Sequence, residues 1–370
     1  MSRSLTFALA LALVACRDRP STARLAPVVE EPRAEERPEV TAWVVPYEDS
    51  LESLERHASV LSTVSPTYFR LAVNALDARL EDWDPGVPFP RARLARIRTG
   101  ASFSVLPMVG CIGECGPKIS RVLDDAAARR RHVADLTRAV GAEHADGLYI
   151  DYEDIDARPE SVTAFFGELG AALHLQDKKL GVAVQEPCGF NPACKREPYP
   201  FDLRELAKKV DRLAIMEYDF SVDGSSAPAP RAWVERGLRR VIDDVGAETA
   251  RARVLCAVPY YGRMTAGLAG AETAVMFAEV GKSRIRNVDA GVGPLVFDPS
   301  SLAKVGPVRV IGADAGQIFF EDHTTLEARL QLIRALPLRG VAIWRLGKED
   351  RCNVDELARF RRLSVPPRCP

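Results

Sequence analysis

The sequence predicts an α/β fold in which eight parallel strands close into a barrel, with a small α+β insertion between the seventh and eighth strands. Three observations predict it. Short apolar runs alternate with helical patterns along the chain, which indicates a parallel sheet with helical crossovers. Eight such runs are present, the number that closes a (β/α)8, or TIM, barrel. The chain has 370 residues, 47% of them hydrophobic, so it is long enough to bury the core of such a barrel.

The expected strands are short apolar runs, and the segments between them have helical patterns or turn residues. In chain order, the strands are Val40–Val45, Ser65–Leu71, Phe103–Val109, Gly147–Glu153, Leu180–Gln185, Leu213–Phe220, Val254–Tyr260 and Gly340–Leu346. Two of the clearest expected helices are Ser120–Val140 and Pro159–Leu173. The span after the seventh strand is longer than one crossover requires, so residues 263–322 are expected to form an insertion at the barrel rim. Its strands are expected at Ala274–Glu279, Leu295–Phe297 and Gln317–Phe320.

The N-terminus has the pattern of an exported protein. The apolar run from Leu5 to Ala15 is too short to span a bilayer and has the form of a secretory signal. The end of this run, Leu13-Val14-Ala15-Cys16, resembles a bacterial lipobox. Residues 1–16 are therefore expected to be a lipoprotein signal, with Cys16 as the acylated residue that anchors the protein to a membrane. An ordinary cleaved signal with an incidental cysteine is the alternative.

The segment after Cys16 differs in composition from the rest of the chain. Residues 17–38 are rich in Pro, Arg and Glu, so we expect a disordered tether there and the folded domain at residues 39–370. Arg17 directly follows the cysteine, which by the usual sorting pattern indicates the outer membrane where a cell has one. The expected location is thus the cell envelope, with the folded domain held outside the cytoplasm.

Charge argues against a nucleic-acid partner. The formal net charge is −1, and the short Arg129–Arg131 run lies in an expected helix, where it fits a solvated face better than a phosphate-binding patch. No other basic block concentrates enough Lys and Arg to follow a phosphate backbone. The sequence does not determine the oligomeric state, and we expect a monomer.

Seven cysteines remain besides Cys16, and six of them fall into local pairs. Because export permits disulfides, we expect the pairs Cys111–Cys115, Cys188–Cys194 and Cys352–Cys369, with Cys256 alone in an apolar strand. A metal site is the alternative for the first two pairs, but both lack tight Cys-x-x-Cys spacing and a nearby histidine. His144 and His323 likewise have no second histidine at ligand spacing, so no metal and no cofactor is expected.

The stretch from Asp146 to Glu153 carries the clearest chemistry. In a strand, successive side chains alternate between faces, so Tyr149, Asp151 and Glu153 share one face of it. The two carboxyl groups are then about 6–7 Å apart along the backbone, close enough to interact. Mutual repulsion should raise one pKa and leave a proton donor near neutral pH. A proton donor beside a second carboxylate is typical of a glycosidase, whereas a solvated strand edge or helix cap is the alternative for an isolated pair.

This stretch resembles the signature Asp-Gly-x-Asp-x-Asp-x-Glu of family 18 glycoside hydrolases, the chitinase family. Asp146, Gly147, Asp151 and Glu153 match it, and Tyr149 stands where most members have the first inner Asp. The resemblance implies that Glu153 protonates the glycosidic oxygen. It also implies that Asp151 holds the substrate's N-acetyl group, whose carbonyl oxygen attacks the anomeric carbon. We expect lower or differently pH-tuned activity, because tyrosine can donate a hydrogen bond to Asp151 but carries no negative charge near pH 7.

Three further segments match the family in order. Met216-Glu217-Tyr218-Asp219 resembles Met-x-Tyr-Asp at the end of strand six, which implies that Tyr218 holds the N-acetyl carbonyl and that Met216 and Asp219 contact the sugar. Pro259 to Arg263 resembles the end of strand seven, which implies that Tyr261 faces the cleft. Gly340 to Trp344 resembles the last strand, whose Trp forms the floor beneath the sugar; a plain core role is the alternative for Met216, Tyr218 and Trp344.

Two more residues are candidates for the cleft, and one family motif is missing. Gln185, at the end of the fifth strand, and Trp43, on the first, are expected to line the cleft. Strand three has Ser104 to Gly110 in the place where many members carry Ser-x-Gly-Gly.

Together, the matches imply an exported glycosidase that cleaves β-1,4 bonds next to N-acetylglucosamine with retention of configuration. A sugar-binding protein that has lost turnover, suggested by Tyr149, and a purely structural envelope lipoprotein are the alternatives. The sequence does not distinguish chitin from peptidoglycan or the core of N-linked glycans as the polymer.

Overall fold

The computed structural model describes residues 37–185, 199–221, 225–265, 274–277, 284–285, 288–310, 315–347, 349–364, 366–367 and 369. Several expectations lie outside these residues. They are the signal at residues 1–16 with Cys16, nearly all of the tether at 17–38, and the Cys188–Cys194 pair. Within the part that the structure describes, no helix is both long and apolar enough to span a membrane.

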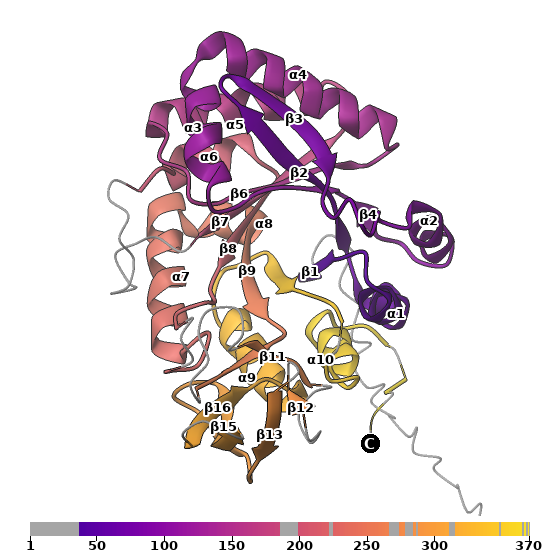
Figure 1. Cartoon of the computed structure of the whole chain (residues 1–370), viewed down its shortest axis with the longest axis vertical. Coiled ribbons are helices and arrows are strands. Elements are labelled where there is room, and N and C mark those ends of the chain that lie inside the picture. The colour runs from indigo at the N-terminus through magenta and orange to yellow at the C-terminus, as the bar shows by residue number, and fades with distance from the viewer. Residues whose placement is uncertain are drawn as a thin grey trace, which may run out of the picture. The chain divides into compact units, whose positions relative to one another are not determined.

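Eight parallel strands close into a barrel, as the sequence predicts (Figure 1). Each pairs with the next in parallel, and β1 also pairs with β2, which leaves no open edge. The strands are β1 (Glu39–Val44), β2 (Thr63–Asn74), β5 (Met108–Cys111), β6 (Gly147–Tyr152), β7 (Lys179–Gln185), β8 (Arg212–Met216), β9 (Val254–Pro259) and β17 (Gly340–Trp344).

Two of the eight strands differ from the prediction. The third consists of two pieces, β4 (Ser104–Val105) and β5, because Pro107 between them has no backbone N–H to donate to the ladder. The sixth, β8, ends at Met216, so Tyr218 and Asp219 lie in the loop that follows it. Asp219 has φ +61°, a left-handed conformation that an extended strand does not contain.

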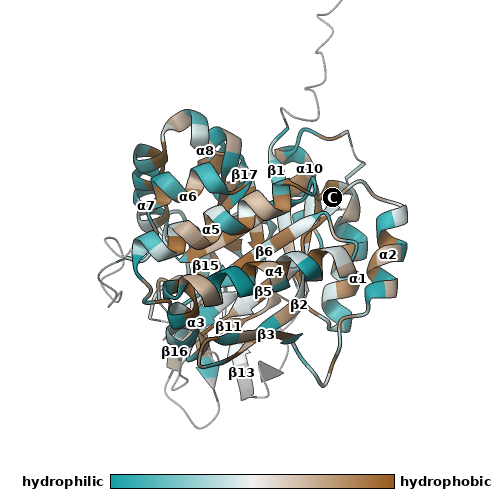
Figure 2. Cartoon of the chain, turned by 90° about the horizontal axis from the view of Figure 1, so that it is seen from above, coloured by the Kyte–Doolittle hydropathy of each residue, from teal (hydrophilic) through white to brown (hydrophobic). Residues whose placement is uncertain are grey.

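Helices cover the outside of the barrel, and Figure 2 shows their apolar residues interleaved with hydrophilic ones. They are α1 (Glu48–His57), α2 (Arg91–Thr99), α3 (Cys115–Asp124), α4 (Ala126–Ala142), α5 (Pro159–His174), α6 (Leu203–Lys209), α7 (Arg231–Val245), α8 (Ala247–Arg253), α9 (His323–Arg334) and α10 (Asn353–Phe360), with a short 3-10 turn at Ala58–Val60. The helix predicted at Pro159–Leu173 is confirmed as α5.

The single helix predicted at Ser120–Val140 is wrong, because the chain breaks at Asp125. This residue is extended, with φ −91° and ψ 114°, and separates α3 from α4. Its side chain accepts hydrogen bonds from the backbone N–H groups of Ala127 and Ala128 and so caps α4. Continuous helical periodicity therefore concealed a capping residue.

The segment between β9 and β17 contains an antiparallel sheet, which occupies the expected place of the insertion. Its strands are β10 (Gly262–Met264), β11 (Ala274–Val275), β12 (Arg284–Ile285), β13 (Val288–Val292), β14 (Val296–Asp298), β15 (Ala303–Val310) and β16 (Ala315–Phe320). Between Gly262 and Phe320, every element that the structure describes is a strand, and α9 follows them before β17. A second addition was not predicted: β3 (Asp77–Asp82) pairs antiparallel with the end of β2 and forms a hairpin.

The core has an outer and an inner layer. The outer layer, which includes Ile150, Phe165 and Leu213, lies between the strands and the helices. The inner layer fills the barrel itself and includes Trp43, Met108, Tyr149 and Met216. Two of the expected disulfides, Cys111–Cys115 and Cys352–Cys369, are confirmed, and Cys256 is a buried free thiol.

Candidate active site

Strand β6 presents one face to each core layer, as its alternation predicts. Leu148, Ile150 and Tyr152 pack in the outer layer, whereas Tyr149 packs inside the barrel. Asp151 shares the inward face with Tyr149 and lies near the carboxyl end of the strand. In parallel barrels, this end carries the functional groups.

Asp151 is a buried acid whose side chain is 4% exposed. Its Oδ1 atom accepts no hydrogen bond from any described residue. Burial raises the pKa of Asp151 to about 7, because the charged form loses its hydration. The predicted raised pKa is therefore found, but at the inner acid and through desolvation rather than through repulsion between two carboxylates.

Glu153 follows directly after β6 and is only partly buried. Its Oε2 accepts a hydrogen bond of 3.0 Å from the side-chain amide of Gln185 at the end of β7. The structure thus places Gln185 in direct contact with Glu153, the expected acid. Glu153 is not fully buried, and a proton donor must be reachable by its ligand.

The backbone around Glu153 is held by the segment from Cys111 to Gly116. Glu153 donates its backbone N–H to the carbonyl of Cys111 at 2.8 Å, and Asp154 accepts from the backbone N–H of Gly113 at 2.9 Å. A Cβ on Gly116 would lie 2.4 Å from the backbone oxygen of Glu153, so only glycine permits this approach. The Cys111–Cys115 disulfide closes the same segment. These contacts fix the position from which the Glu153 side chain extends.

Tyr218 lies in the loop after β8, close to both acids. Burial raises the pKa of its hydroxyl well above the ordinary value, and the nearby Asp151, Tyr261 and Glu153 raise it further. Its ring packs against the inner layer that contains Met216, so the two side chains point to the same side, as predicted. Tyr218 therefore remains a protonated hydrogen-bond donor close to both acids.

Asp219 is exposed and is oriented by two residues that follow β9. The hydroxyl of Tyr261 donates to Asp219 Oδ1 at 2.5 Å, and Arg263 forms an ion pair with the same oxygen. The Arg263 guanidinium also lies 5.1 Å from the centre of the Tyr261 ring. The loops after β8 and β9 are thus tied together by a carboxylate that faces solvent.

Three aromatic residues form the floor of the site in two layers: the partly buried Trp344 above, and the buried Trp43 and Tyr149 below it. Trp344, at the end of β17, is partly buried, and the centre of its ring lies 5.9 Å from that of Trp43. Trp43 in turn lies 5.4 Å from Tyr149. Trp43 is 1% exposed and Tyr149 is 0% exposed, so neither of these two residues, predicted to contact the sugar, presents a surface to it in this structure. They support Trp344 from below.

Tyr149 makes no hydrogen bond to Asp151, although a tyrosine at this position can donate one. The hydroxyl of Tyr149 contacts no partner among the described residues. Its ring occupies the space above Gly181 on β7, where a Cβ would lie 2.4 Å from the ring. The close packing of the ring against β7 sets the direction of the side chain.

Trp83 belongs to the site and was missed by the sequence reasoning. It follows β3, and its ring covers Gly110, where a Cβ would lie 2.2 Å from it. Gly110 pairs with Asp151 in the sheet, and Trp83, like Tyr218 and Trp344, packs against the inner layer. The only signal for it was a strand alternation through Arg79 and Glu81 in a segment read as a crossover.

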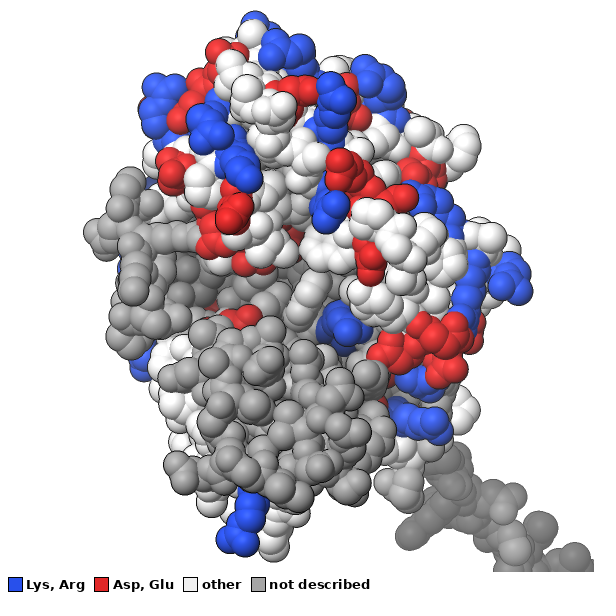
Figure 3. All heavy atoms as spheres, viewed as in Figure 1, with Lys and Arg blue, Asp and Glu red and all other residues white. Residues whose placement is uncertain are grey.

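The surface is hollowed across the middle of the view in Figure 3, where acidic side chains lie beside the recess. No metal-binding group is formed by the acids described above. Within the described residues, His323, Asp350 and Cys352 come close enough to hold an ion, but Cys352 is bonded to Cys369 and cannot be a ligand. His323 instead pairs with Asp350 at 2.7 Å. His144 is exposed on the turn before β6.

The sequence profile described as glycosyl hydrolases family 18 matches residues 67–349. The chain belongs to glycosyl hydrolase family 18. The match covers strands β5 to β17 and includes Asp151, Glu153, Tyr218 and Trp344. No curated protein matches the chain in sequence.

Solved structures share the fold of this family 18 protein at low identity. The chitinase from Chromobacterium violaceum ATCC 12472 has a TM-score of 0.72 and 20% identity, over 87% of this chain and 98% of that one. The spore cortex-lytic enzyme SleL of Bacillus megaterium QM B1551 has a TM-score of 0.70 and 15% identity, over 91% and 77%. The putative sporulation-specific glycosylase ydhD of Bacillus subtilis has a TM-score of 0.62 and 18% identity, over 76% and 91%.

Proposed function

We propose that the protein is a retaining glycosidase that cleaves β-1,4 bonds next to N-acetylglucosamine. The observation that carries the proposal is the arrangement around Glu153. This partly buried residue is held by Gln185, with the buried Asp151 two positions earlier on β6 and the Tyr218 hydroxyl close to both. A proton donor, a second acid with a raised pKa and a neutral hydrogen-bond donor are the groups that substrate-assisted glycoside hydrolysis uses.

Glu153 is the proposed acid, and later base, of the reaction. It gives its proton to the leaving oxygen as the N-acetyl carbonyl attacks the anomeric carbon, and it then takes a proton from the water that opens the cyclic intermediate. Asp151 orients the N-acetyl nitrogen and stabilises the positive charge that develops there. The Tyr218 hydroxyl donates to the N-acetyl carbonyl and holds it for attack. Trp344 supplies an apolar face for the sugar ring.

The polymer and the cellular location are separate proposals. Two of the similar structures are titled as a spore cortex-lytic enzyme and a sporulation-specific glycosylase, which favours peptidoglycan over chitin. We further propose that the protein is exported and anchored through lipid on Cys16. The residues Leu13 to Cys16 support this anchor, and labelling with a radioactive fatty acid before and after Cys16→Ala tests it.

Glu153→Gln tests the function most directly. We expect the rate of product release from N-acetylglucosamine oligomers and purified peptidoglycan to fall about 10³-fold, because the general acid is lost while the shape of the side chain is kept. Glu160→Gln, at an exposed position in the first turn of α5, is the matched control and should keep the wild-type rate. Equal rates for wild type and Glu153→Gln, or no product from any N-acetylated glycan, would contradict the proposal.

A sugar-binding protein without turnover is the second candidate, because Tyr149 replaces an inner acid of the family signature. Calorimetry with N-acetylglucosamine oligomers, followed by mass spectrometry of the same sample, separates the two candidates. Binding with intact oligomers after long incubation favours the second, and shortened products favour the first.

A further inference from the structure

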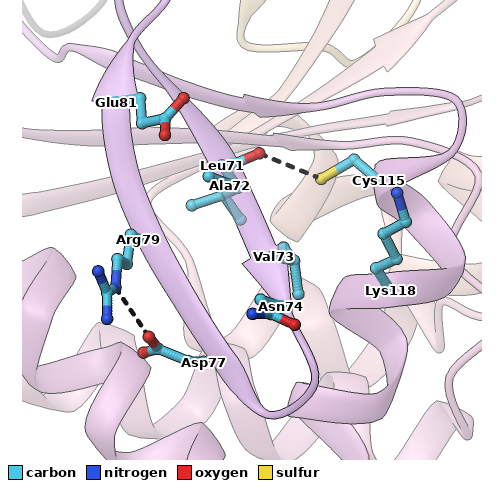
Figure 4. A pocket seen from close by; sticks show the side chains of 9 residues that line it. All are labelled: Leu71, Ala72, Val73, Asn74, Asp77, Arg79, Glu81, Cys115 and Lys118. Carbon is cyan, nitrogen blue, oxygen red and sulfur yellow. Dashed lines mark hydrogen bonds and ion pairs between the residues drawn. The ribbon is translucent and has the colours of Figure 1, made fainter.

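Two adjoining cavities lie along the β2–β3 hairpin, outside the barrel. One has a volume of about 490 Å³ and the other about 500 Å³, and they share Leu71, Ala72, Glu81 and Cys115. Figure 4 shows the outer one, with Cys115 and Lys118 on α3 and the pair Arg79–Asp77 on the hairpin. Each volume is in the range of small-ligand sites. We call the two cavities together the hairpin groove.

The hairpin has one apolar face and one charged face. Leu71, Ala78 and Leu80 pack into the outer core layer. The strand register places Arg70 opposite Glu81 and Ala72 opposite Arg79 on the other face, which solvent reaches. Leu71 and Val73 from the apolar face line the groove together with the charged side chains, so a ligand in the groove meets residues of both faces.

Trp83 connects the hairpin groove with the active site. It continues the alternation of Arg79 and Glu81, and its backbone N–H still bonds to the carbonyl of Tyr68 at 2.9 Å. Its ring lines the inner cavity and, like the side chains of Tyr218 and Trp344, packs against the inner core layer. A glycan bound over Trp344 that extends across Trp83 therefore enters the groove.

Positive charge is in slight excess in the groove. The lining includes Arg70, Arg79 and Lys118 against Asp77 and Glu81, so there are three cations to two anions. Arg70 pairs with Glu81 at 3.2 Å and Arg79 with Asp77 at 2.8 Å, and all four side chains are about half exposed or more. Lys118 pairs at 3.6 Å with Glu114, which is 95% exposed and does not line the groove.

These ion pairs are easily exchanged. Exposed salt bridges stabilise a fold little, because water screens them and the side chains lose freedom on pairing. An incoming carboxylate can therefore replace Asp77 or Glu81 as the partner of a guanidinium, and an incoming ammonium can take the released acid. A neutral sugar gains no such exchange.

We propose that the hairpin groove binds a carboxylate-bearing substituent on the glycan, such as a lactyl-peptide side chain, and thereby selects substituted over neutral polymers. The proposal rests on the glycosidase function proposed above and names its substrate class. Trp83 packs against the sugar that carries the substituent, and Arg79 and Lys118 pair with the carboxylates farther out.

The test compares two glycans of equal length, a neutral N-acetylglucosamine oligomer and one whose alternate sugars carry lactyl-peptide groups. In the double variant Arg79→Glu with Lys118→Glu, we expect KM for the substituted glycan to rise about tenfold, with kcat and the kinetics on the neutral glycan unchanged. Arg239→Glu is the matched control, because Arg239 forms an exposed pair with Glu235 on α7, outside the groove. Equal effects on both glycans, or none on either, would overturn the proposal.

A binding measurement separates this proposal from the proposed function. In the background of Glu153→Gln, calorimetry should give a Kd for the substituted glycan that is about tenfold weaker after Arg79→Glu with Lys118→Glu, and the difference should shrink at high salt. If the wild type cleaves neither glycan but this difference in Kd is found, the glycosidase function is rejected and the binding role of the hairpin groove is kept. If the wild type cleaves both glycans and the difference in Kd is absent, only the proposed binding role of the hairpin groove is rejected.

Discussion

The acids at the two ends of the barrel differ in their hydrogen-bond and ion-pair partners. At the amino end, Glu39 is 3% exposed and pairs with Arg212 at 2.5 Å and Arg339 at 3.4 Å. Asp146, just before β6, accepts two hydrogen bonds from Arg98 and one from the backbone of Val105. The buried carboxylate of Glu39 and the partly exposed one of Asp146 are thus both paired with cations or N–H donors, as a stabilising role requires.

At the carboxyl end, Asp151 is buried to the same degree without such compensation. Among the described residues, no arginine or lysine pairs with it, and one of its oxygens accepts no hydrogen bond. Its pKa is accordingly raised. Asp146 and Asp151 belong to one sequence signature, the first directly before β6 and the second near its carboxyl end, yet only the second has an environment that is costly for its charge. Such an uncompensated acid marks a functional position more clearly than the motif does.

The largest expected effect comes from removing the charge of the uncompensated acid. In Asp151→Asn, we expect the rate of glycan hydrolysis to fall at least about 100-fold, because the group that stabilises the developing charge is lost. Initial rates on N-acetylglucosamine oligomers measure this. Asp156→Asn, exposed in the following loop, is the control and should keep the rate.

The same substitution should change how stability depends on pH. Because the folded state holds the Asp151 proton up to pH about 7 and the unfolded state releases it near pH 4, the wild type loses stability as pH rises between these values. The variant lacks this loss. Its unfolding free energy relative to wild type should therefore increase by on the order of 4 kcal/mol from pH 4 to pH 8. Denaturant titrations at both pH values test this, and a constant difference would count against the raised pKa.

The compensated acid at the other end should show the opposite pattern. Glu39→Gln leaves Arg212 and Arg339 without their carboxylate, so we expect the free energy of unfolding to fall by about 3 kcal/mol while kcat changes less than about twofold. Thermal melts and rates well below the melting temperature give the two numbers. Glu235→Gln, which breaks only an exposed pair on α7, should cost less than about 0.5 kcal/mol. A large loss of kcat in Glu39→Gln would contradict the assignment of a stabilising role to Glu39 and a functional role to Asp151.

The smallest effect is expected for a substitution at Tyr149, which packs inside the barrel between its amino and carboxyl ends. Tyr149→Phe keeps the ring against Trp43 and Gly181 and removes a hydroxyl that contacts no described partner. We expect stability to change by less than about 1 kcal/mol, or to rise slightly, with an unchanged pH profile of kcat. If activity fell strongly, Tyr149 would act on Asp151 through a contact that the structure does not contain.

Much of the fold followed from local pattern. Each of the eight barrel strands lies within a few residues of its predicted position, and the inward face of β6 is the predicted one. The errors have local causes that periodicity conceals, namely the cap at Asp125 and the proline that interrupts the third strand. The β2–β3 hairpin was missed because its short second strand is mostly charged and exposed.

The sequence by itself determined which elements form, their order and which residues of each strand share a face, because hydrophobic periodicity depends on neighbours in the chain. Tertiary structure alone decided that Trp43 and Tyr149 lie beneath the floor, that Trp83 covers Gly110 and that Glu39 meets Arg212, 173 residues away. Burial, and with it the pKa of Asp151, arises when distant segments exclude water from a side chain. A local sequence pattern does not show which side chains lose contact with water. A motif can therefore identify Asp151 as a candidate acid, but its pKa depends on tertiary packing.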